Sequence, residues 1–296
     1  ANSTTGYSLT DHAFDSLGNI VVAGISVNNT WPDNKHFWHK IGKNGDILVT
    51  RTFNDSNSGS DVTDIAIDSS DNIYVCNRYQ QGVSHLLKFN SSGTYQWIRR
   101  LNHPGWPVNG KYAMPQDIAI DSNDNVFLLG YILNGISGPS YRFWIAKYDT
   151  SGNLAWVKIY AKDINQSIDA YGITTDSSGN IYVSGGGNQV NNYYNEGYIA
   201  KINSSGTPQW FGALRGPYSA TYGNNHLRMV GFAVRVDSSG NSYFCGRANR
   251  GQGPGTNNDL FLTKFDSSGN HQWHQFVGTD NFDVFWDLEI DDNDQI

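Results

Sequence analysis

The stretch Asp176-Ser-Ser-Gly-Asn-Ile-Tyr-Val-Ser-Gly185 decides the fold, because the chain repeats it from end to end. The further copies begin at Asp15, Asp68, Asp121, Asp237 and Asp291, and the last of these runs off the end of the sequence. These six motif aspartates follow one another at intervals of 53, 53, 55, 61 and 54 residues. A self-similar unit of roughly 50 residues is typical of repeat architectures such as propellers.

A second motif follows each of the first five copies, and its clearest example is Lys201-Ile-Asn-Ser-Ser-Gly-Thr-Pro-Gln-Trp210. Both motifs place an Asx-Ser-Ser-Gly-type turn between two apolar runs, which is a hairpin signal. The Asx side chain can bond its own backbone, and glycine accepts the left-handed position. Each unit therefore holds four strands, predicted in the second copy at about 61–67, 72–77, 84–90 and 95–100.

Four-stranded units that repeat in this way predict an all-β fold, a β-propeller with five full repeats and the start of a sixth. One such sheet cannot bury both of its faces, so neighbouring units must stack. We expect a single domain over 1–296 that is truncated at its C-terminus. Its blades are predicted at about 8–52, 61–101, 115–160, 168–214 and 229–278, with a partial one at 281–296.

The paired motifs at 176–185 and 199–210 resemble those of the seven-bladed β-propeller repeat family of bacterial surface proteins and large phage virion proteins. The resemblance covers essentially the whole chain. It implies a propeller architecture and an extracellular, cell-surface or virion setting, and it implies no single activity. Whether the ring closes with six or seven blades stays open.

Composition excludes two classes of partner. The net charge is −7 and the pI is near 5.5, whereas binding to nucleic acid requires a basic surface. No apolar run approaches the length of a membrane span. Cys76 and Cys245 occupy the same place in two non-adjacent repeats, so we expect two buried thiols and no disulfide.

Repetition also separates scaffold residues from candidate site residues. A residue present in every repeat belongs to the scaffold, because a single ligand site rarely needs five copies of one side chain. The repeated tryptophans are therefore expected to wedge between blades, and the repeated lysines to be structural. These two sets are Trp97, Trp156, Trp210 and Trp273, and Lys40, Lys88, Lys147, Lys201 and Lys264.

One repeated feature allows two interpretations. Four residues before the motif aspartates stand Asp11, Asp64, Asp117 and Asp287. A ring of carboxylates at a channel could hold Ca²⁺ or Mg²⁺, which prefer oxygen ligands. Alternatively, each carboxylate accepts hydrogen bonds from backbone N–H groups of its neighbour, as buried acids usually do. No other cofactor is expected.

The long, unlike connections are where binding is expected. They join the second strand to the third and one blade to the next, and they share one face. Their aromatic, histidine and arginine side chains suit recognition of a sugar or a protein. The candidate ligand-binding residues are Trp31, Tyr79, Trp106, Tyr131, Tyr193, Tyr194, Tyr222, His226 and Arg228. The alternative is that these loops pack on one another.

No catalytic constellation is evident: the sequence has no Gly-x-Ser-x-Gly elbow and no His-Glu-x-x-His pair. We therefore expect a non-enzymatic binding or structural propeller, either a phage tail or capsid appendage or a bacterial surface adhesin. Its expected partners are glycans or proteins on a cell surface, or neighbouring virion subunits. A carbohydrate-active enzyme on the long-loop face and a purely structural spacer are the alternatives.

Overall fold

A computed structural model of the chain describes residues 6–27, 35–53, 60–79, 84–101, 113–133, 141–160, 166–189, 192–214, 218–219, 225–226, 228–249, 258–278, 283, 285–291 and 293–296. Every regular element within these residues is a β-strand. No helix of this described part is long and apolar enough to cross a membrane.

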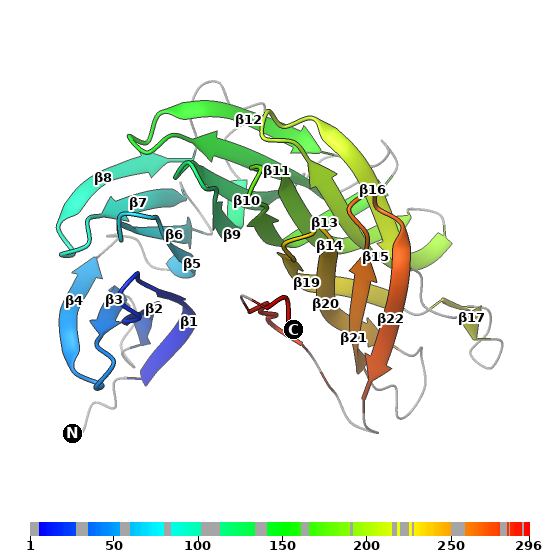
Figure 1. The fold of residues 1–296 in the computed structure, drawn as a ribbon, viewed down its shortest axis with the longest axis horizontal. Coiled ribbons are helices and arrows are strands. Elements are labelled where there is room, and N and C mark those ends of the chain that lie inside the picture. Colours follow the sequence, from blue (N-terminus) through cyan, green and yellow to red (C-terminus); the bar gives the residue numbers. More distant parts are fainter. Residues whose placement is uncertain are drawn as a thin grey trace. The chain divides into compact units, whose positions relative to one another are not determined.

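Twenty of the strands form five four-stranded sheets, each a simple meander in chain order (Figure 1). The first two sheets consist of β1 Gly6–Phe14, β2 Ile20–Val27, β3 Lys35–Ile41 and β4 Ile47–Phe53, and of β5 Ser60–Ile67, β6 Ile73–Tyr79, β7 His85–Phe89 and β8 Tyr95–Arg100. The third sheet consists of β9 Ala113–Ile120, β10 Val126–Leu133, β11 Tyr141–Tyr148 and β12 Leu154–Tyr160.

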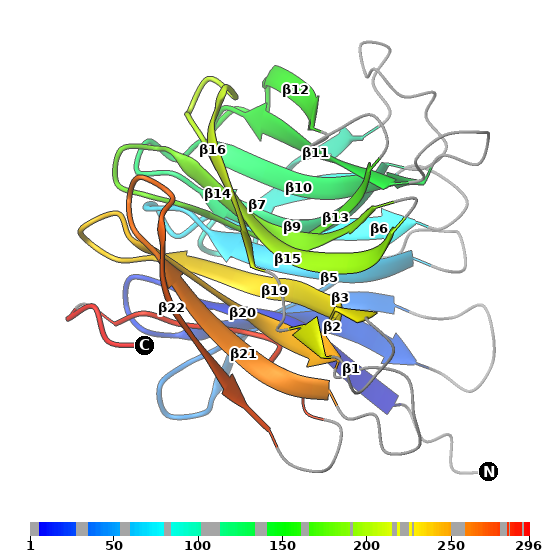
Figure 2. The same ribbon diagram turned by 90° about the vertical axis from the view of Figure 1, so that its right-hand side faces the viewer.

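The last two full sheets consist of β13 Gln166–Thr175, β14 Ile181–Gln189, β15 Asn192–Ile202 and β16 Pro208–Leu214, and of β19 Arg228–Val236, β20 Ser242–Asn249, β21 Asn258–Phe265 and β22 His271–Val277. Figure 2 shows the fifth sheet, β19 to β22, as one twisted antiparallel sheet. A two-stranded ribbon, β17 Tyr218–Ser219 and β18 Asn225–His226, lies between the fourth and fifth sheets in sequence.

The hairpin prediction is confirmed by the turns between first and second strands. In the second sheet, Asp68 N–H donates to Asn72 O at 3.0 Å, and Asp71 N–H donates to Asp68 O at 2.9 Å. The Asp68 carboxylate closes the same turn by accepting from the backbone N–H groups of Ser70 and Asn72. The turns between third and fourth strands carry glycine at positive φ, for example Gly152 at +78°.

The chain divides into two compact units, and each has its own core. Unit 1 comprises Ala1–Ile120, Asp124–Leu128 and Ala146–Val157, and unit 2 comprises Asp121–Asn123, Leu129–Ile145 and Lys158–Ile296. Unit 1 is packed around apolar side chains such as Trp38, Val75 and Phe89. Unit 2 is packed around Tyr182, Phe244 and Phe261, among others. The number of blades and the closure of a ring stay predictions.

A bulge recurs in the first strand of the sheets. The pairing register shifts between Leu9 and Asp11 in β1, and at the corresponding places in β5, β13 and β19. The extra residue is in each case the fifth before the motif aspartate: Thr10, Thr63, Tyr171 and Phe232. Bulges of this kind redirect a side chain away from the regular pleat.

Candidate functional site

The repeated lysines are scaffold residues, as predicted. Four of them, Lys40, Lys88, Lys201 and Lys264, lie within ion-pair distance of the motif aspartate of their own sheet. The Nζ–Oδ2 distances range from 2.6 Å for Lys40–Asp15 to 3.8 Å for Lys201–Asp176. Burial opposes ionisation of Asp15, but hydrogen bonds from Lys40 and Asn19 outweigh burial and lower the pKa of Asp15 to about 2. These pairs fix the two hairpins of one sheet to each other.

Two of the repeated tryptophans, Trp97 and Trp210, contact the turn of the next sheet, as the sequence predicts. Trp97 on β8 packs edge-on against Tyr74 of its own sheet. It also contacts the turn of the next sheet, where a Cβ on Gly152 would lie 2.8 Å from Trp97 Cε2. In unit 2, Trp210 donates its indole N–H to Ser267 O at 3.2 Å. Neither tryptophan is therefore free to serve as a ligand platform.

A third repeated contact joins the turns of successive sheets. Asp71 has φ of 61°, and its carboxylate accepts from both the N–H and the hydroxyl of Ser16 at 2.7 Å. The same Asp–Ser clasp joins Asp124 to Ser69 and Asp294 to Ser238. The edge of the sheets that carries the short turns is thus occupied by repeated structural contacts; we call it the short-turn edge.

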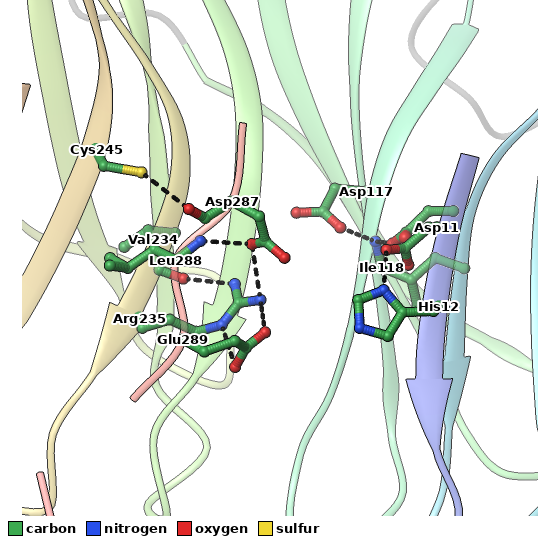
Figure 3. A network of polar contacts seen from close by, with 11 residues as sticks. Asp11, His12, Asp117, Ile118, Val234, Arg235, Cys245, Asp287, Leu288 and Glu289 are labelled. Carbon is green, nitrogen blue, oxygen red and sulfur yellow. Dashed lines mark hydrogen bonds and ion pairs between the residues drawn. The ribbon is translucent and has the colours of Figure 1, made fainter. Parts of the chain in front are cut away.

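Three of the predicted ring carboxylates, Asp11, Asp64 and Asp117, meet in unit 1. Figure 3 shows two of them, Asp11 and Asp117. Asp64 is 7% exposed and accepts from Ile118 N–H of the next first strand at 2.6 Å, as the capping interpretation predicts. Burial, followed by the neighbouring carboxyls of Asp117 and Asp11, raises the pKa of Asp64 well above its usual value. Asp64 also shares hydrogen bonds with both of these carboxyls. The raised pKa favours the protonated form of the Asp64 carboxyl beside Asp117 and Asp11.

Asp287 belongs to unit 2 and has other partners. Its Oδ1 accepts from Leu288 N–H at 2.8 Å and lies 3.2 Å from Arg235 Nη2. Within the described residues, no group of three or more His, Cys, Asp or Glu side chains is arranged to hold a metal ion. The calcium hypothesis for Asp11, Asp64, Asp117 and Asp287 stays a prediction.

We expect Asp64→Asn to increase stability progressively, relative to wild type, as the pH rises above 3.8, the usual pKa of an Asp carboxyl. Because the folded-state pKa of Asp64 is raised, its contribution to stability is complete at low pH and is lost as the pH rises through that value. Asparagine keeps the acceptor for Ile118 N–H and cannot ionise. Urea unfolding at several pH values measures the difference.

Asp46→Asn, at an exposed position in the turn between β3 and β4, serves as the control for replacing a carboxylate by an amide. A pH-independent difference between Asp64→Asn and wild type would contradict the raised pKa of Asp64. Repeating the series with Ca²⁺ and with a chelator tests the metal hypothesis. Stabilisation by Ca²⁺ of wild type, but not of Asp64→Asn, would support a calcium site.

The predicted ligand-binding residues are only partly described. Trp31, Trp106 and Tyr222 lie outside the described residues. Five others lie in strands without a described side chain: Tyr79 on β6, Tyr193 and Tyr194 on β15, His226 on β18 and Arg228 on β19. Tyr131 on β10 is half-buried, and its carbonyl accepts from the Trp144 indole at 3.2 Å. Their role in binding stays a prediction.

The topology nevertheless places the ends of these strands. In an antiparallel meander, the connections from second to third strand and from fourth to first strand leave from the edge opposite the short turns. Tyr79 is the last residue of β6 and Arg228 the first of β19, so both stand at this long-connection edge. The short, repeated turns therefore lie at one edge of the sheets, and the long, varied connections leave from the opposite edge.

The two cysteines are free and buried, as predicted. Burial raises the pKa of both Cys76 and Cys245 to about 12. A thiol with such a pKa carries almost no thiolate at neutral pH and is inert as a nucleophile.

A hollow of about 400 Å³ lies on unit 2 between β12 and β16. Its lining consists of Lys158, Ile159, Tyr160, Gly206, Pro208 and Phe211. Lys158 Nζ donates to Ser205 O at 2.7 Å, and Tyr160 OH donates to Gly206 O at 3.0 Å. These polar side chains thus serve sheet packing, and none of the described lining residues is a carboxylate that could act as a general acid.

One group of side chains was missed by the sequence reasoning. Tyr171 and Phe232 are the bulge residues of β13 and β19, and Trp286 holds the same place before Asp291. Their ring centroids lie 5.4 Å apart for Tyr171–Phe232 and 5.1 Å apart for Phe232–Trp286. The signal was available in the aligned repeats, where Thr10, Thr63 and Gln116 precede these three aromatics in the same column. We call the three residues the aromatic row.

Several solved structures have a fold similar to that of this chain. One is a protein of unknown function from Bacteroides caccae, with a TM-score of 0.52, 12% identity, and alignment over 92% of this chain and 82% of that one. Another is the subtype N11 neuraminidase-like protein of A/flat-faced bat/Peru (H18N11), with a TM-score of 0.52, 10% identity, and coverage of 93% and 74%. The chain has a propeller-like fold.

At these identities the likeness concerns the fold alone. No protein-family model matches the sequence, and no curated protein matches it. Function therefore has to be argued from the residues of this propeller-like chain.

Proposed function

We propose that this chain is a non-enzymatic recognition propeller that binds a glycan or a protein through its long-connection edge. The observation that carries the proposal is the difference between the two edges of its sheets. At the short-turn edge, the repeated Asp, Ser, Lys and Trp side chains bond within a sheet or to the next one. The connections of unlike sequence all leave from the other edge.

Uniform contacts on one edge and varied sequence on the other are typical of scaffolds that present binding loops. The varied connections contain Trp31, Trp106 and Tyr222, and Tyr193 and Tyr194 flank one of them. Aromatic rings of this kind provide flat apolar area at low cost in conformational entropy, and neighbouring amides can bond sugar hydroxyls or peptide groups.

We place the protein outside the cell or on a virion, as a phage tail or capsid appendage or as a bacterial surface adhesin. The resemblance of its repeats to those of bacterial surface and phage virion propellers supports this setting. The net charge of −7 also disfavours nucleic acid as a partner. Its targets would be cell-surface glycans or proteins, or neighbouring virion subunits.

A glycan-array and whole-cell binding screen, with and without Ca²⁺, tests the proposal. The double substitution Trp106→Ala and Tyr193→Ala should weaken binding by about tenfold or more, because aromatic anchors dominate recognition surfaces. Its melting temperature should stay close to that of wild type. Tyr95→Ala, at an exposed position beside a short turn, is the matched control and should bind like wild type.

Two outcomes would contradict recognition at this edge: unchanged binding by the double variant, or its unfolding, which would make these aromatics part of the core. Absence of binding to any glycan or cell would instead favour a structural spacer whose loops contact only neighbouring subunits.

One observation favours a carbohydrate-active enzyme as second candidate. A carboxyl with a raised pKa next to other carboxyls, as at Asp64, is the arrangement that glycosidases use for a general acid. Against this, Asp64 is only 7% exposed and bonded to Ile118 N–H, so a substrate oxygen has little access to it. Release of reducing sugar by wild type, and loss of this release in Asp64→Asn, would establish a carbohydrate-active enzyme instead.

A further inference from the structure

Two histidines lie side by side on β22, the last strand of the fifth sheet. The pairing between β21 and β22 shifts by one residue, which leaves Gln272 as an extra residue in β22. In a regular strand, residues three apart point to opposite faces. The bulge returns His271 and His274 to the same face, and His274 Nδ1 lies 3.2 Å from His271 Nε2.

The bulge belongs to the scaffold, but the two imidazoles do not. The first, second and fourth sheets show the same register shift in their last strands. The residues that take the places of the two histidines there are Ile47 and Thr50, Tyr95 and Ile98, and Pro208 and Phe211. These strands form and pair without histidine, so the pair in the fifth sheet reflects a requirement other than sheet formation.

The pair lies on the face of β22 that is turned toward the fourth sheet. His271 packs edge-on against Phe265, with ring centroids 5.3 Å apart. Phe265 in turn contacts β16, where a Cβ on Gly212 would lie 2.6 Å from Phe265 Cε1. Trp273 points to the opposite face of β22, the face on which its counterpart Trp210 contacts the following sheet. The surroundings of the pair are therefore residues of the fourth and fifth sheets.

The fourth sheet brings no basic side chain to the turn beside this pair. In each of the first three sheets, a basic residue of the last strand donates to a glycine carbonyl in the turn of the next sheet. These residues are Arg51, Arg99 and Lys158. The fourth sheet has Gly212 in their place. A cation at the turn that precedes His271 therefore avoids the repulsion that the other sheets would impose.

Both rings are exposed and have fixed neighbours. Phe276 flanks His274, with ring centroids 5.2 Å apart. Partial desolvation, followed by the neighbouring His274, lowers the pKa of His271, which favours the neutral imidazole that ligates metals. His271 also has a hydrogen bond to the backbone of Trp273, a contact of the kind that orients ligand imidazoles.

We infer that His271 and His274 form a binding site for Zn²⁺ on the last strand of the fifth sheet. Two nitrogens that ligate a tetrahedral ion at about 2.0–2.1 Å lie about 3.3 Å apart, close to the observed 3.2 Å. Rotation of each ring by about 35° would direct both lone pairs at one ion. Two protein ligands leave coordination positions open, which water or a group of a bound partner would fill.

This site goes beyond the proposed recognition at the long-connection edge, because it shares no residue with that edge. It is also separate from the carboxylate cluster around Asp64. Ca²⁺ and Mg²⁺ prefer oxygen ligands, whereas imidazole suits Zn²⁺. Zn²⁺ binding at the histidine pair can therefore be tested independently of the glycan and calcium hypotheses.

Isothermal titration calorimetry of the full chain with Zn²⁺ tests the inference. His271→Asn and His274→Asn should each weaken Zn²⁺ binding by about tenfold or more, at least the loss seen when a contact that orients a metal ligand is removed. Both side chains are exposed, so the melting temperatures of the metal-free variants should stay close to that of wild type.

Nuclear magnetic resonance of the wild type locates the ion directly. The imidazole ¹⁵N signals of His271 and His274, assigned by their loss in the two variants, should shift on addition of Zn²⁺ and not of Ca²⁺. His12→Asn is the matched control, because His12 is an exposed histidine that packs against Phe14 rather than against a second histidine. It should leave the shifts of the pair unchanged.

Three outcomes would overturn the inference. They are absence of Zn²⁺ binding, equal Zn²⁺ affinity of wild type and both Asn variants, and Zn²⁺ binding that leaves the imidazole signals of His271 and His274 in place. If either variant unfolds, the signals of the wild-type protein still decide between the outcomes.

Discussion

Gly152→Val is expected to lower the free energy of unfolding by about 2–6 kcal/mol, from two sources that add. Gly152 has φ of +78°, and a β-branched residue held in that region costs about 1–3 kcal/mol. Its Cβ would also lie 2.8 Å from Trp97 Cε2 and 2.9 Å from Arg99 Nε. Overpacking of such a contact costs another 1–3 kcal/mol or so. Urea unfolding measures the sum.

Gly45→Val separates the two sources. Gly45 stands in the same turn of the first sheet with φ of +86°, and no atom lies within 4 Å of the position its Cβ would take. This variant should therefore lose only the conformational part, about 1–3 kcal/mol. Equal losses for Gly45→Val and Gly152→Val would show that Trp97 does not wedge against the turn of the next sheet.

Lys40→Met should destabilise the protein by about 3–5 kcal/mol, because it leaves a buried carboxylate without its cation. The Asp15 side chain is 1% exposed and lies 2.6 Å from Lys40 Nζ. Adding Asp15→Asn to Lys40→Met should recover part of the loss by removing the unpaired charge. Lys264→Met, at a pair 3.7 Å long with a more exposed lysine, should cost less.

The loss in Lys40→Met should also depend on pH. The pKa of Asp15 is lowered from 3.8 to about 2 in the folded protein, so its contribution is complete above 3.8 and disappears as the pH falls through about 2. The stability difference between wild type and Lys40→Met should shrink over the same interval. A difference that stays constant down to pH 2 would mean that packing of the lysine stem, rather than the ion pair, stabilises the sheet.

The strands and turns were predictable because they are encoded locally. In the second copy the expected strands 61–67, 72–77, 84–90 and 95–100 correspond to Ser60–Ile67, Ile73–Tyr79, His85–Phe89 and Tyr95–Arg100. Apolar alternation and Asx-Ser-Ser-Gly turns act within a few residues. Comparison of the five copies shows which residues of each pattern recur. The roles of the repeated lysines and tryptophans followed from the same repetition.

The bulges and the aromatic row were not predicted, because they depend on register between strands. The first strands keep a constant spacing from Asp64 or Asp117 to the motif aspartate, and nothing in that spacing reveals that Thr63 is unpaired. The ion pair between Arg235 and Glu289 was not predicted for a similar reason. Glu289 is one of two glutamates in the chain, but 54 residues separate it from the arginine that it binds.

The Asp–Ser clasps make individual backbone amides into reporters of docking between successive repeats. The N–H groups of Ser16, Ser69 and Ser238 belong to exposed turns, yet each is donated to a carboxylate 55 or 56 residues further along the chain. Their hydrogen-exchange rates should therefore follow the separation of one sheet from the next rather than the opening of their own hairpins. Hydrogen-exchange rates of these three amides, measured by nuclear magnetic resonance, would reveal which contact between successive sheets opens first.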